Sequence, residues 1–254
     1  MSNTPATQFP LLEEALYGLH PVQEALRARK RNMVELQLDE KAPKERFHPL
    51  VRLAEEFGVR VHRCSKHELF ESCGSRHHQG VVLITTSYPY TPLSDDLFTR
   101  PRLLLLDNIE DPRNAGAILR SALLFGFQTI LVPLKGGAGI YPSVVKTSAG
   151  ASEHLDIVRD ANSAKYFQRA LKAGYRTVAM DAKGDTVLGD IPPDDSRPLM
   201  LIMGGEDKRV GQFILNEAEI VARIPQQGQV NSLNASVAAG IALYHFSRLE
   251  ASHG

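Results

Sequence analysis

The chain has 254 residues, of which 43% are hydrophobic and 23% are charged, and its formal net charge is +0. This length supports a sizeable core in one large domain or two smaller ones, and no apolar run approaches the ~20 residues of a membrane-spanning helix. The start, MSNTPATQFP, lacks signal-peptide and transit-peptide features, so we expect a cytoplasmic protein without membrane contact. Without net charge, a nucleic-acid partner would have to be bound by local basic patches.

Residues 1–86 have the pattern of a small α/β domain. The expected helices begin at Pro21, span 43–57 and span 66–73, and the expected strands cover 33–39, 59–64 and 80–86. Proline opens the first two helices, and Gly58 and Gly74 follow the ends of the last two, as is typical of helix boundaries. Residues 87–101 contain three prolines and little hydrophobic periodicity, which predicts a linker.

Residues 102–254 are predicted to form a second domain. Short apolar strands are expected over 103–107, 129–133, 175–181, 198–204 and 221–225, and they alternate with amphipathic segments such as the helix over 163–174. This alternation favours a mostly parallel sheet that is covered on both faces. A final helix from Ser232 to Ser252 is rich in alanine and glycine, which predicts close packing against a sheet, a helix or a second subunit.

Three segments place polar residues after predicted strands, where an open α/β sheet binds its ligands. In the first segment, Asn114 stands where it could cap a helix, and a structural cap is the favoured interpretation from this segment alone. Arg120 lies on the same predicted helix among apolar neighbours, so it is either exposed to solvent or held for a function.

In the second segment a strand runs into Gly204, Gly205 and Glu206, which suits a tight turn or a ligand lying against bare backbone. The third places Ser232 and Asn234 at the start of the final helix, whose free amide groups could bind a ligand. The sequence contains neither the glycine fingerprint of a dinucleotide-binding fold nor a P-loop motif.

Taken in order, the three segments resemble the motifs of the SpoU (TrmH-like) family of RNA ribose 2′-O-methyltransferases, in the SPOUT superfamily. DNIEDPRNAGAILRSA is similar to motif one, LIMGGE to motif two and IPQQGQVNSLNASVAAGIALY to motif three. YGLHPVQEAL and HHQGVV resemble the RNA-binding domain, which is ribosomal-protein-like, of RlmB-type enzymes. Those enzymes methylate a guanosine of 23S ribosomal RNA, in the large subunit.

The resemblance implies a fold and a set of site residues. The fold would be an α/β parallel-sheet domain with a deep trefoil knot, working as a homodimer whose active sites are completed at the subunit interface. The cofactor S-adenosyl-L-methionine would lie against Gly204, Ile224 and Leu233. The polar residues of the catalytic site would be Asn114, Arg120, Glu206, Ser232 and Asn234.

The chain departs from the family pattern in the loop after Glu206. Family members usually have a glycine two or three residues further on, whereas here Asp207, Lys208, Arg209 and Val210 precede Gly211. In addition, Gln226 replaces a frequent methionine, and Ser121 replaces the usual threonine. These changes could alter contacts with the cofactor.

Methyl transfer to a ribose hydroxyl requires that its proton be accepted or that the developing alkoxide be stabilised. A guanidinium has a pKa of about 12 or above and does not deprotonate in proteins, so it cannot serve as a literal base. We therefore expect Arg120 to act electrostatically, with Glu206 and Asn114 orienting either Arg120 or the RNA.

Two further clusters have open interpretations. Cys64, His67, Cys73, His77 and His78 suggest zinc, but their spacing fits no standard zinc finger, so we expect no metal. The two cysteines are expected to be free thiols. The basic run in 27–31 suits either RNA phosphates or a solvated helix end.

Three other functions remain open from the sequence. The target could be transfer RNA or another ribosomal nucleoside, with the same chemistry. The altered loop after Glu206 is also compatible with a catalytically silent RNA-binding factor of ribosome assembly. A small-molecule enzyme is disfavoured, because it would leave the first domain without a role.

Overall fold

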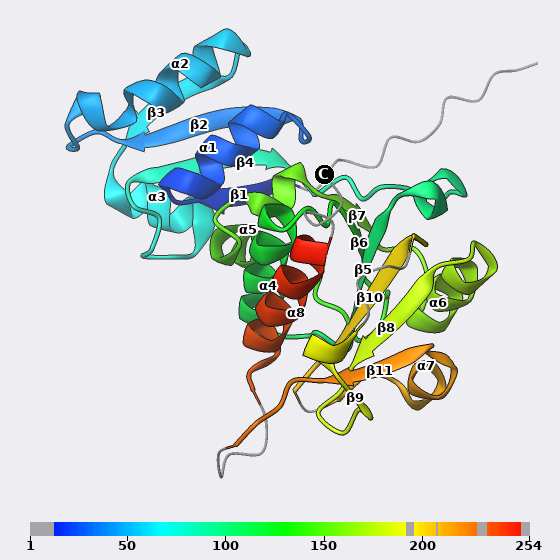
Figure 1. The fold of residues 1–254 in the computed structure, drawn as a ribbon. Helices are drawn as coiled ribbons and strands as arrows, with labels where there is room; N and C mark the ends of the chain where they lie inside the picture. Colours follow the sequence, from blue (N-terminus) through cyan, green and yellow to red (C-terminus); the bar gives the residue numbers. More distant parts are fainter. Residues whose placement is uncertain (1–12, 192–195, 207, 228–232, 250–254) are drawn as a thin grey trace, which may run out of the picture. The chain divides into compact units, whose positions relative to one another are not determined.

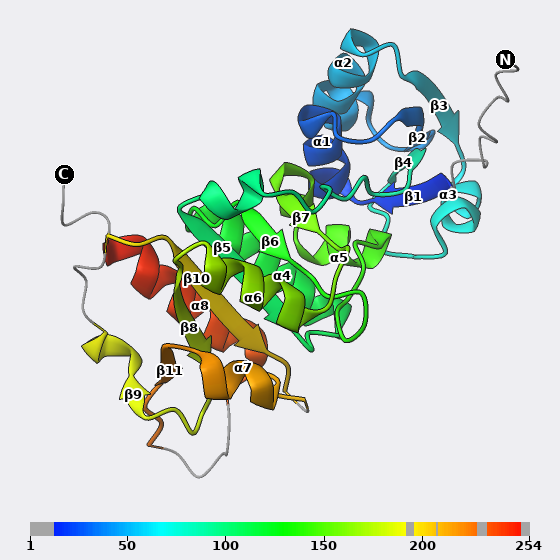
Figure 2. The same ribbon diagram turned by 90° about the vertical axis from the view of Figure 1, so that its right-hand side faces the viewer.

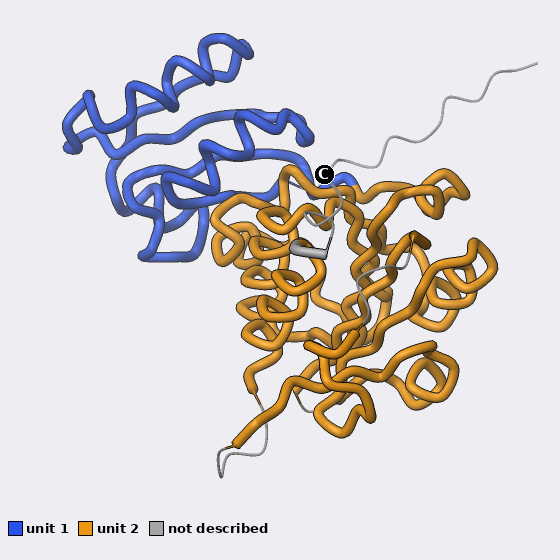
Figure 3. The backbone as a smooth tube through the Cα atoms, in the orientation of Figure 1, with its two compact units in different colours: residues 1–89 blue, residues 90–254 orange. Residues whose placement is uncertain are grey.

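The computed structural model describes residues 13–191, 196–206, 208–227 and 233–249. The chain divides into two compact units, Met1–Pro89 and Tyr90–Gly254 (Figure 3).

The first unit is a four-stranded mixed sheet with helices. Its elements are β1 (Glu13–Tyr17), α1 (Leu19–Ala28), β2 (Met33–Asp39), η1 (Lys44–Phe47), α2 (His48–Glu56), β3 (Arg60–Cys64), α3 (Lys66–Cys73) and β4 (Val81–Thr86). The strand order is β1-β4-β2-β3, in which β4 is antiparallel to both of its neighbours and β2 is parallel to β3. The three predicted strands are confirmed to within one residue at their ends. The first helix begins at Leu19 rather than Pro21, and the helix predicted over 43–57 is divided into η1 and α2. β1 is an additional strand that the sequence pattern did not reveal.

Local chemistry explains why α3 has the predicted bounds. The Ser65 side chain accepts a hydrogen bond from the Glu68 amide, and the Glu68 carboxylate accepts one from the Ser65 amide, which forms a capping box. At the other end, Gly74 adopts a left-handed conformation with φ of 64°, which glycine tolerates without strain. Both helix ends are therefore determined by nearby residues alone.

The second unit is built around a seven-stranded parallel sheet. Its elements are η2 (Asp96–Thr99), β5 (Arg102–Asp107), α4 (Pro112–Leu124), β6 (Thr129–Leu131), α5 (Pro142–Thr147), η3 (Ala151–His154), β7 (Asp156–Val158), α6 (Ser163–Lys172), β8 (Arg176–Met180), β9 (Thr186–Val187), η4 (Leu188–Asp190), β10 (Leu199–Gly204), α7 (Gln212–Glu217), β11 (Ile220–Arg223) and α8 (Ala235–Leu249). The strand order is β7-β6-β5-β10-β8-β11-β9, and every pair of neighbours is parallel.

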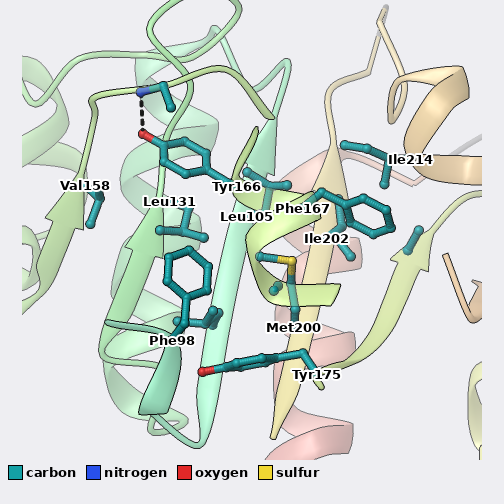
Figure 4. Packing of buried hydrophobic residues seen from close by; sticks show 14 of the residues in the cluster. Phe98, Leu105, Leu131, Val158, Tyr166, Phe167, Tyr175, Met200, Ile202 and Ile214 are labelled. Carbon is teal, nitrogen blue, oxygen red and sulfur yellow. Dashed lines mark hydrogen bonds between the residues drawn. The ribbon is translucent and has the colours of Figure 1, made fainter. Parts of the chain in front are cut away.

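Helices cover both faces of this sheet, as predicted. Figures 1 and 2 show α4, α5 and α8 on one face and α6 and α7 on the other. The core on the α6 side is drawn in Figure 4, where Phe98 packs edge-on against Tyr175 and Tyr166 lies beside the central strands. Within the described residues, no helix is long and apolar enough to cross a membrane.

Most of the predicted linker over 87–101 packs against the second unit. The boundary between the two units falls after Pro89. Leu97 and Phe98 are buried in the core of the second unit, and the Thr91 amide donates a hydrogen bond to Ile157. Apolar residues in a proline-rich stretch still bury their surface when a core is adjacent, so most of this segment is part of the second unit.

Candidate active site

Four neighbouring strands end at one edge of the parallel sheet, in the order β5, β10, β8 and β11. Their ends carry Asp107, Gly204 with Glu206, Asp181 and Ile224, respectively. Because the strands are parallel, residues far apart in the sequence gather at this edge, as in other open α/β sheets. The three sequence motifs therefore meet at a single site.

A hydrogen-bonded cluster of three polar side chains forms the centre of this site. The Asn114 side-chain amide donates to Glu206 Oε1 at 2.9 Å. The Asn234 side-chain amide donates both to Glu206 Oε1 and to Asn114 Oδ1, the latter at 3.0 Å. One residue from each motif thus contributes to a single network.

The position of Asn114 corrects the expectation that it caps its helix. Asp111 is the N-cap of α4, since its side chain accepts a hydrogen bond from the Arg113 amide, and Pro112 follows at the first helical position. Asn114 therefore lies in the first turn, and its side chain is free to bind Glu206 and Asn234.

The Glu206 carboxylate lies at the N-terminus of α8. Its Oε1 atom accepts a long hydrogen bond from the Ala235 amide at 3.4 Å, in addition to the two asparagine amides. A helix N-terminus stabilises a negative charge, so this carboxylate is well placed. Within the described residues Glu206 Oε2 accepts no hydrogen bond, which leaves it available to a ligand.

The loop after Glu206 is held by two residues that follow β5. The Asp107 carboxylate accepts hydrogen bonds from Ser163 Oγ at 2.6 Å and from the Gly211 amide at 2.7 Å. Asn108 donates its side-chain amide to the Arg209 carbonyl at 3.0 Å. The loop is therefore anchored at both of these residues, although it lacks the family glycine; Asp207 lies outside the described residues.

A cavity of about 170 Å³ lies behind the polar cluster. Gly204, Ile224 and Leu233, the residues expected to contact the cofactor, all line it. A Cβ atom on Gly204 would lie 2.4 Å from the Val210 amide nitrogen, and one on Gly205 would lie 2.1 Å from the Asn108 carbonyl oxygen. The two glycines therefore allow the chain after β10 to pack closely against neighbouring backbone at the edge of the cavity.

A second hollow, of about 190 Å³, opens on the other side of Glu206. Its lining includes Asn108, Glu110, Asn114 and Lys208, and Lys208 forms an exposed ion pair with Glu110 at 3.0 Å. Both hollows are lined by Gly205 and Glu206. The polar cluster thus stands at the shared wall of the two hollows.

Arg120 does not join this cluster within one chain. It is exposed on α4, and six residues separate it from Asn114, which places the two roughly 120° apart around the helix axis. Arg113, seven residues before Arg120, shares its side of the helix. The pKa of Arg113 is raised, first by its hydrogen bond with Asp111 and to a smaller extent by the charge of Glu206. Ser232 lies outside the described residues.

Sequence reasoning missed Asp107 and Asn108, which anchor the loop, and Asp181, which lines the cavity. A polar residue directly after a buried parallel strand was the available signal. Asp107 and Asp181 were each recognised as strand ends without a function being drawn from the position.

In the first unit, the basic run is largely occupied by partners within the chain. Arg31 is buried and pairs with Glu14 at 2.6 Å, which corrects its interpretation as a phosphate contact. Arg27 pairs with Glu24, and Arg29 pairs with Glu56 while lying over the Phe57 ring. Arg31 therefore stabilises the fold.

The cysteine and histidine cluster is dispersed in the first unit. Cys64 is buried, His78 accepts a hydrogen bond from the Gly80 amide, and His67 lies 3.3 Å from Glu71. In the part of the chain that the structure describes, no three such side chains are placed to hold a metal ion.

Two family models match this chain. The model of the SpoU rRNA methylase family matches residues 101–244, and the model of the RNA 2′-O ribose methyltransferase substrate-binding domain matches residues 15–91. A Mycolicibacterium paratuberculosis protein, named as an uncharacterized tRNA/rRNA methyltransferase, is 36% identical over 92% of this chain and 77% of its own length. Bacillus subtilis YacO, whose name places it in the TrmH family of tRNA/rRNA methyltransferases, is 32% identical over 91% of this chain and 94% of its own.

The fold also matches solved structures. An AdoMet-bound rRNA methyltransferase from Sinorhizobium meliloti has a TM-score of 0.75 and 26% identity, covering 93% of this chain and 87% of that one. The fold and the site define an RNA methyltransferase that uses S-adenosylmethionine. The chain belongs to the SpoU methylase family, with an RNA substrate-binding domain ahead of its catalytic domain.

Proposed function

We propose that this protein methylates the 2′ hydroxyl of a ribose in RNA, and that its target is a guanosine of large-subunit ribosomal RNA. The observation that carries the proposal is the Asn114, Glu206 and Asn234 cluster at the wall between two hollows. One hollow suits the cofactor, and the other gives a ribose access to Glu206. The guanosine target is supported by the RlmB-like signatures YGLHPVQEAL and HHQGVV.

S-adenosylmethionine supplies a methyl group on a sulfonium, which is transferred to an attacking oxygen. The chain's residues must orient a ribose hydroxyl and favour loss of its proton. Glu206 Oε2 is the acceptor that meets this hydroxyl, while Asn114 and Asn234 hold the carboxylate in place through Oε1. The role of the asparagines is therefore to position Glu206.

We further propose a homodimer formed through α4 and α8. The outer side of these two helices exposes four large apolar residues, namely Leu124 at 73%, Val237 at 49%, Ile241 at 39% and Tyr244 at 50%. An apolar face of this kind is typical of an interaction surface, and a second copy would bury it. Arg120 precedes Leu124 by one helical turn and lies on the same side of α4, so it would reach the partner's active site and stabilise charge there.

The knot and the identity of the target RNA are two further questions. The trefoil knot remains a prediction of the family resemblance. Transfer RNA is the alternative target, because the relatives' names include both tRNA and rRNA.

The target is tested by incubating the protein and radiolabelled S-adenosylmethionine with unmodified 23S rRNA or unmodified tRNA. The RNA is then digested to nucleosides and analysed by mass spectrometry. We expect 2′-O-methylguanosine from the rRNA only. Label in tRNA alone would favour the alternative target, and no label with intact cofactor binding would favour a silent RNA-binding factor.

A further inference from the structure

The wall of the 170 Å³ cavity contains a carboxylate that the proposed reaction does not use. Asp181 directly follows β8, the strand between β10 and β11, and lines the cavity together with Gly204 and Ile224. Its side chain is only 6% exposed. A carboxylate removed from water to this degree is costly unless hydrogen-bond donors or a positive charge compensate it.

The backbone around Asp181 fixes the position of this carboxylate. The Asp181 amide donates to the Ala222 carbonyl at 3.0 Å, and the Gly184 amide donates to the Asp181 carbonyl at 3.0 Å. The Arg223 guanidinium then donates to the carbonyls of Gly184 and Asp185 at 2.7 and 2.8 Å. The turn after β8 is thus tied to β11, and Asp181 cannot easily move to solvent.

Only one of the two carboxylate oxygens has partners in the protein. Oδ1 accepts a hydrogen bond from the Lys183 amide at 2.8 Å and lies 3.9 Å from an Arg209 guanidinium nitrogen. Arg209 is 52% exposed, so this ion pair is loose and partly screened. Among the described residues, none donates a hydrogen bond to Oδ2. Oδ2 is therefore available to accept a hydrogen bond from a ligand.

We propose that Asp181 is a cofactor-binding residue whose Oδ2 accepts hydrogen bonds from a donor group of S-adenosylmethionine. A carboxylate is an acceptor only, so it matches the donors of the cofactor, which are its α-ammonium, its ribose hydroxyls and its adenine amino group. Its negative charge also favours a ligand that carries a positive sulfonium. This inference rests on the assignment of the cavity to the cofactor.

The proposal is tested by calorimetric titration of the full chain and of Asp181→Asn, which keeps the acceptor for the Lys183 amide. The ligands are S-adenosylhomocysteine, which has all of these donors, and 5′-methylthioadenosine, which has the nucleoside but no amino acid. Asp185→Asn is the matched control, because Asp185 is exposed in the same turn and does not line the cavity. Thermal unfolding without ligand checks that each variant is folded, and Asp181→Ser replaces Asp181→Asn if that variant does not fold.

We expect Asp181→Asn to bind S-adenosylhomocysteine about ten- to hundredfold more weakly, the effect of losing one charge-assisted hydrogen bond, while Asp185→Asn binds like the unchanged protein. Equal weakening for 5′-methylthioadenosine assigns Oδ2 to the donors of the nucleoside, its ribose hydroxyls or its adenine amino group, and undiminished binding of that ligand assigns it to the α-ammonium. Unchanged affinity of Asp181→Asn for both ligands overturns the proposal. Failure of the unchanged protein to bind either ligand counts instead against the cofactor site itself.

Discussion

Glu206, from the second sequence motif, is hydrogen-bonded through one oxygen atom to residues of the first and third motifs. Oε1 accepts hydrogen bonds from Asn114, Asn234 and the Ala235 amide, while Oε2 faces no donor among the described residues. The side chain is therefore held in place on one side and available on the other. In the proposed reaction, Glu206 acts through the charge and acceptor capacity of Oε2.

Glu206→Gln keeps the size of the side chain but replaces one acceptor by an amide donor. We expect methyl transfer to fall by about 10²-fold or more, because the acceptor for the ribose hydroxyl is lost. Cofactor affinity should change by less than about threefold, since the side chain keeps its size and Glu206 is one of many residues that line the cavity. Single-turnover assays and calorimetry measure the two quantities, with Glu217→Gln on α7 as control. Normal transfer by Glu206→Gln would remove Glu206 from the mechanism.

Cys64 provides a test of the first unit. Burial, with a smaller effect from the charge of Glu68, raises the pKa of its thiol from 9.0 to about 11. At pH 9 about one hundredth of the Cys64 side chains should be thiolate in the folded protein, against about half in the unfolded chain. We expect iodoacetamide to label Cys64 slowly until urea is added, as measured by peptide mass spectrometry. Equally fast labelling of the folded protein would show that Cys64 is not buried.

The raised pKa of Cys64 also predicts how the stability of the fold changes with pH. Because the folded pKa is raised, the neutral thiol is favoured in the fold, and this contribution is present below pH 9 and lost as the pH rises towards 11. A Cys64→Ser variant removes the titrating thiol and should show less loss of stability across this pH range.

At the scale of elements, the sequence predicts best where local residues determine the structure. The bounds of α3 follow from its capping box and from Gly74, and β2 matches the predicted strand over 33–39. The short strands β7 and β9 have three and two residues, too few to show a pattern, and they form because the sheet beside them offers hydrogen bonds. Their existence depends on the tertiary structure.

The sequence predicted which residues belong to the polar cluster, but it did not predict how they are arranged. The resemblance supplied Asn114, Glu206 and Asn234, and parallel strands bring them together. The cap of α4 was placed wrongly at Asn114, because both Asp111 and Asn114 suit that role and only the chain path distinguishes them. Arg120 cannot be placed in a site from one chain alone, since it points away from the cluster.

A charged residue on the apolar face of α4 and α8 tests the proposed dimer. Ile241→Asp should convert the proposed dimer into monomers and reduce methyl transfer by about tenfold or more, because a carboxylate cannot be buried against an apolar partner. Val34→Asp on β2 is the control, since Val34 is similarly exposed, at 47% against 39% for Ile241. Sedimentation velocity measures the oligomeric state. A dimer that persists in Ile241→Asp would place the interface elsewhere.

At the scale of the whole molecule, the proposed dimer gives Arg120 a role in the partner's site. Arg120→Ala should lose about 10³-fold in methyl transfer, and Arg120→Lys should retain more activity because it keeps the charge without the planar fork. Full activity in Arg120→Ala would refute both the electrostatic role and the role as a base.

Mixing two inactive variants tests whether Arg120 acts across the interface. If Arg120→Ala and Glu206→Gln chains exchange at random, half of the dimers are mixed and each mixed dimer has one complete site, so roughly a quarter of full activity should return. No recovery after confirmed subunit exchange would place Arg120 and Glu206 in the same chain's site.

Ribose 2′-O-methylation can be tested by changing one oxygen of the RNA. Once the modified nucleotide is mapped, an otherwise identical RNA with a 2′-deoxy sugar at that position is offered to the protein with radiolabelled S-adenosylmethionine, and cofactor binding is measured in the same preparation. We expect unchanged cofactor binding and no methyl transfer. Transfer to the deoxy RNA at the same nucleotide would show that the base is methylated rather than the ribose.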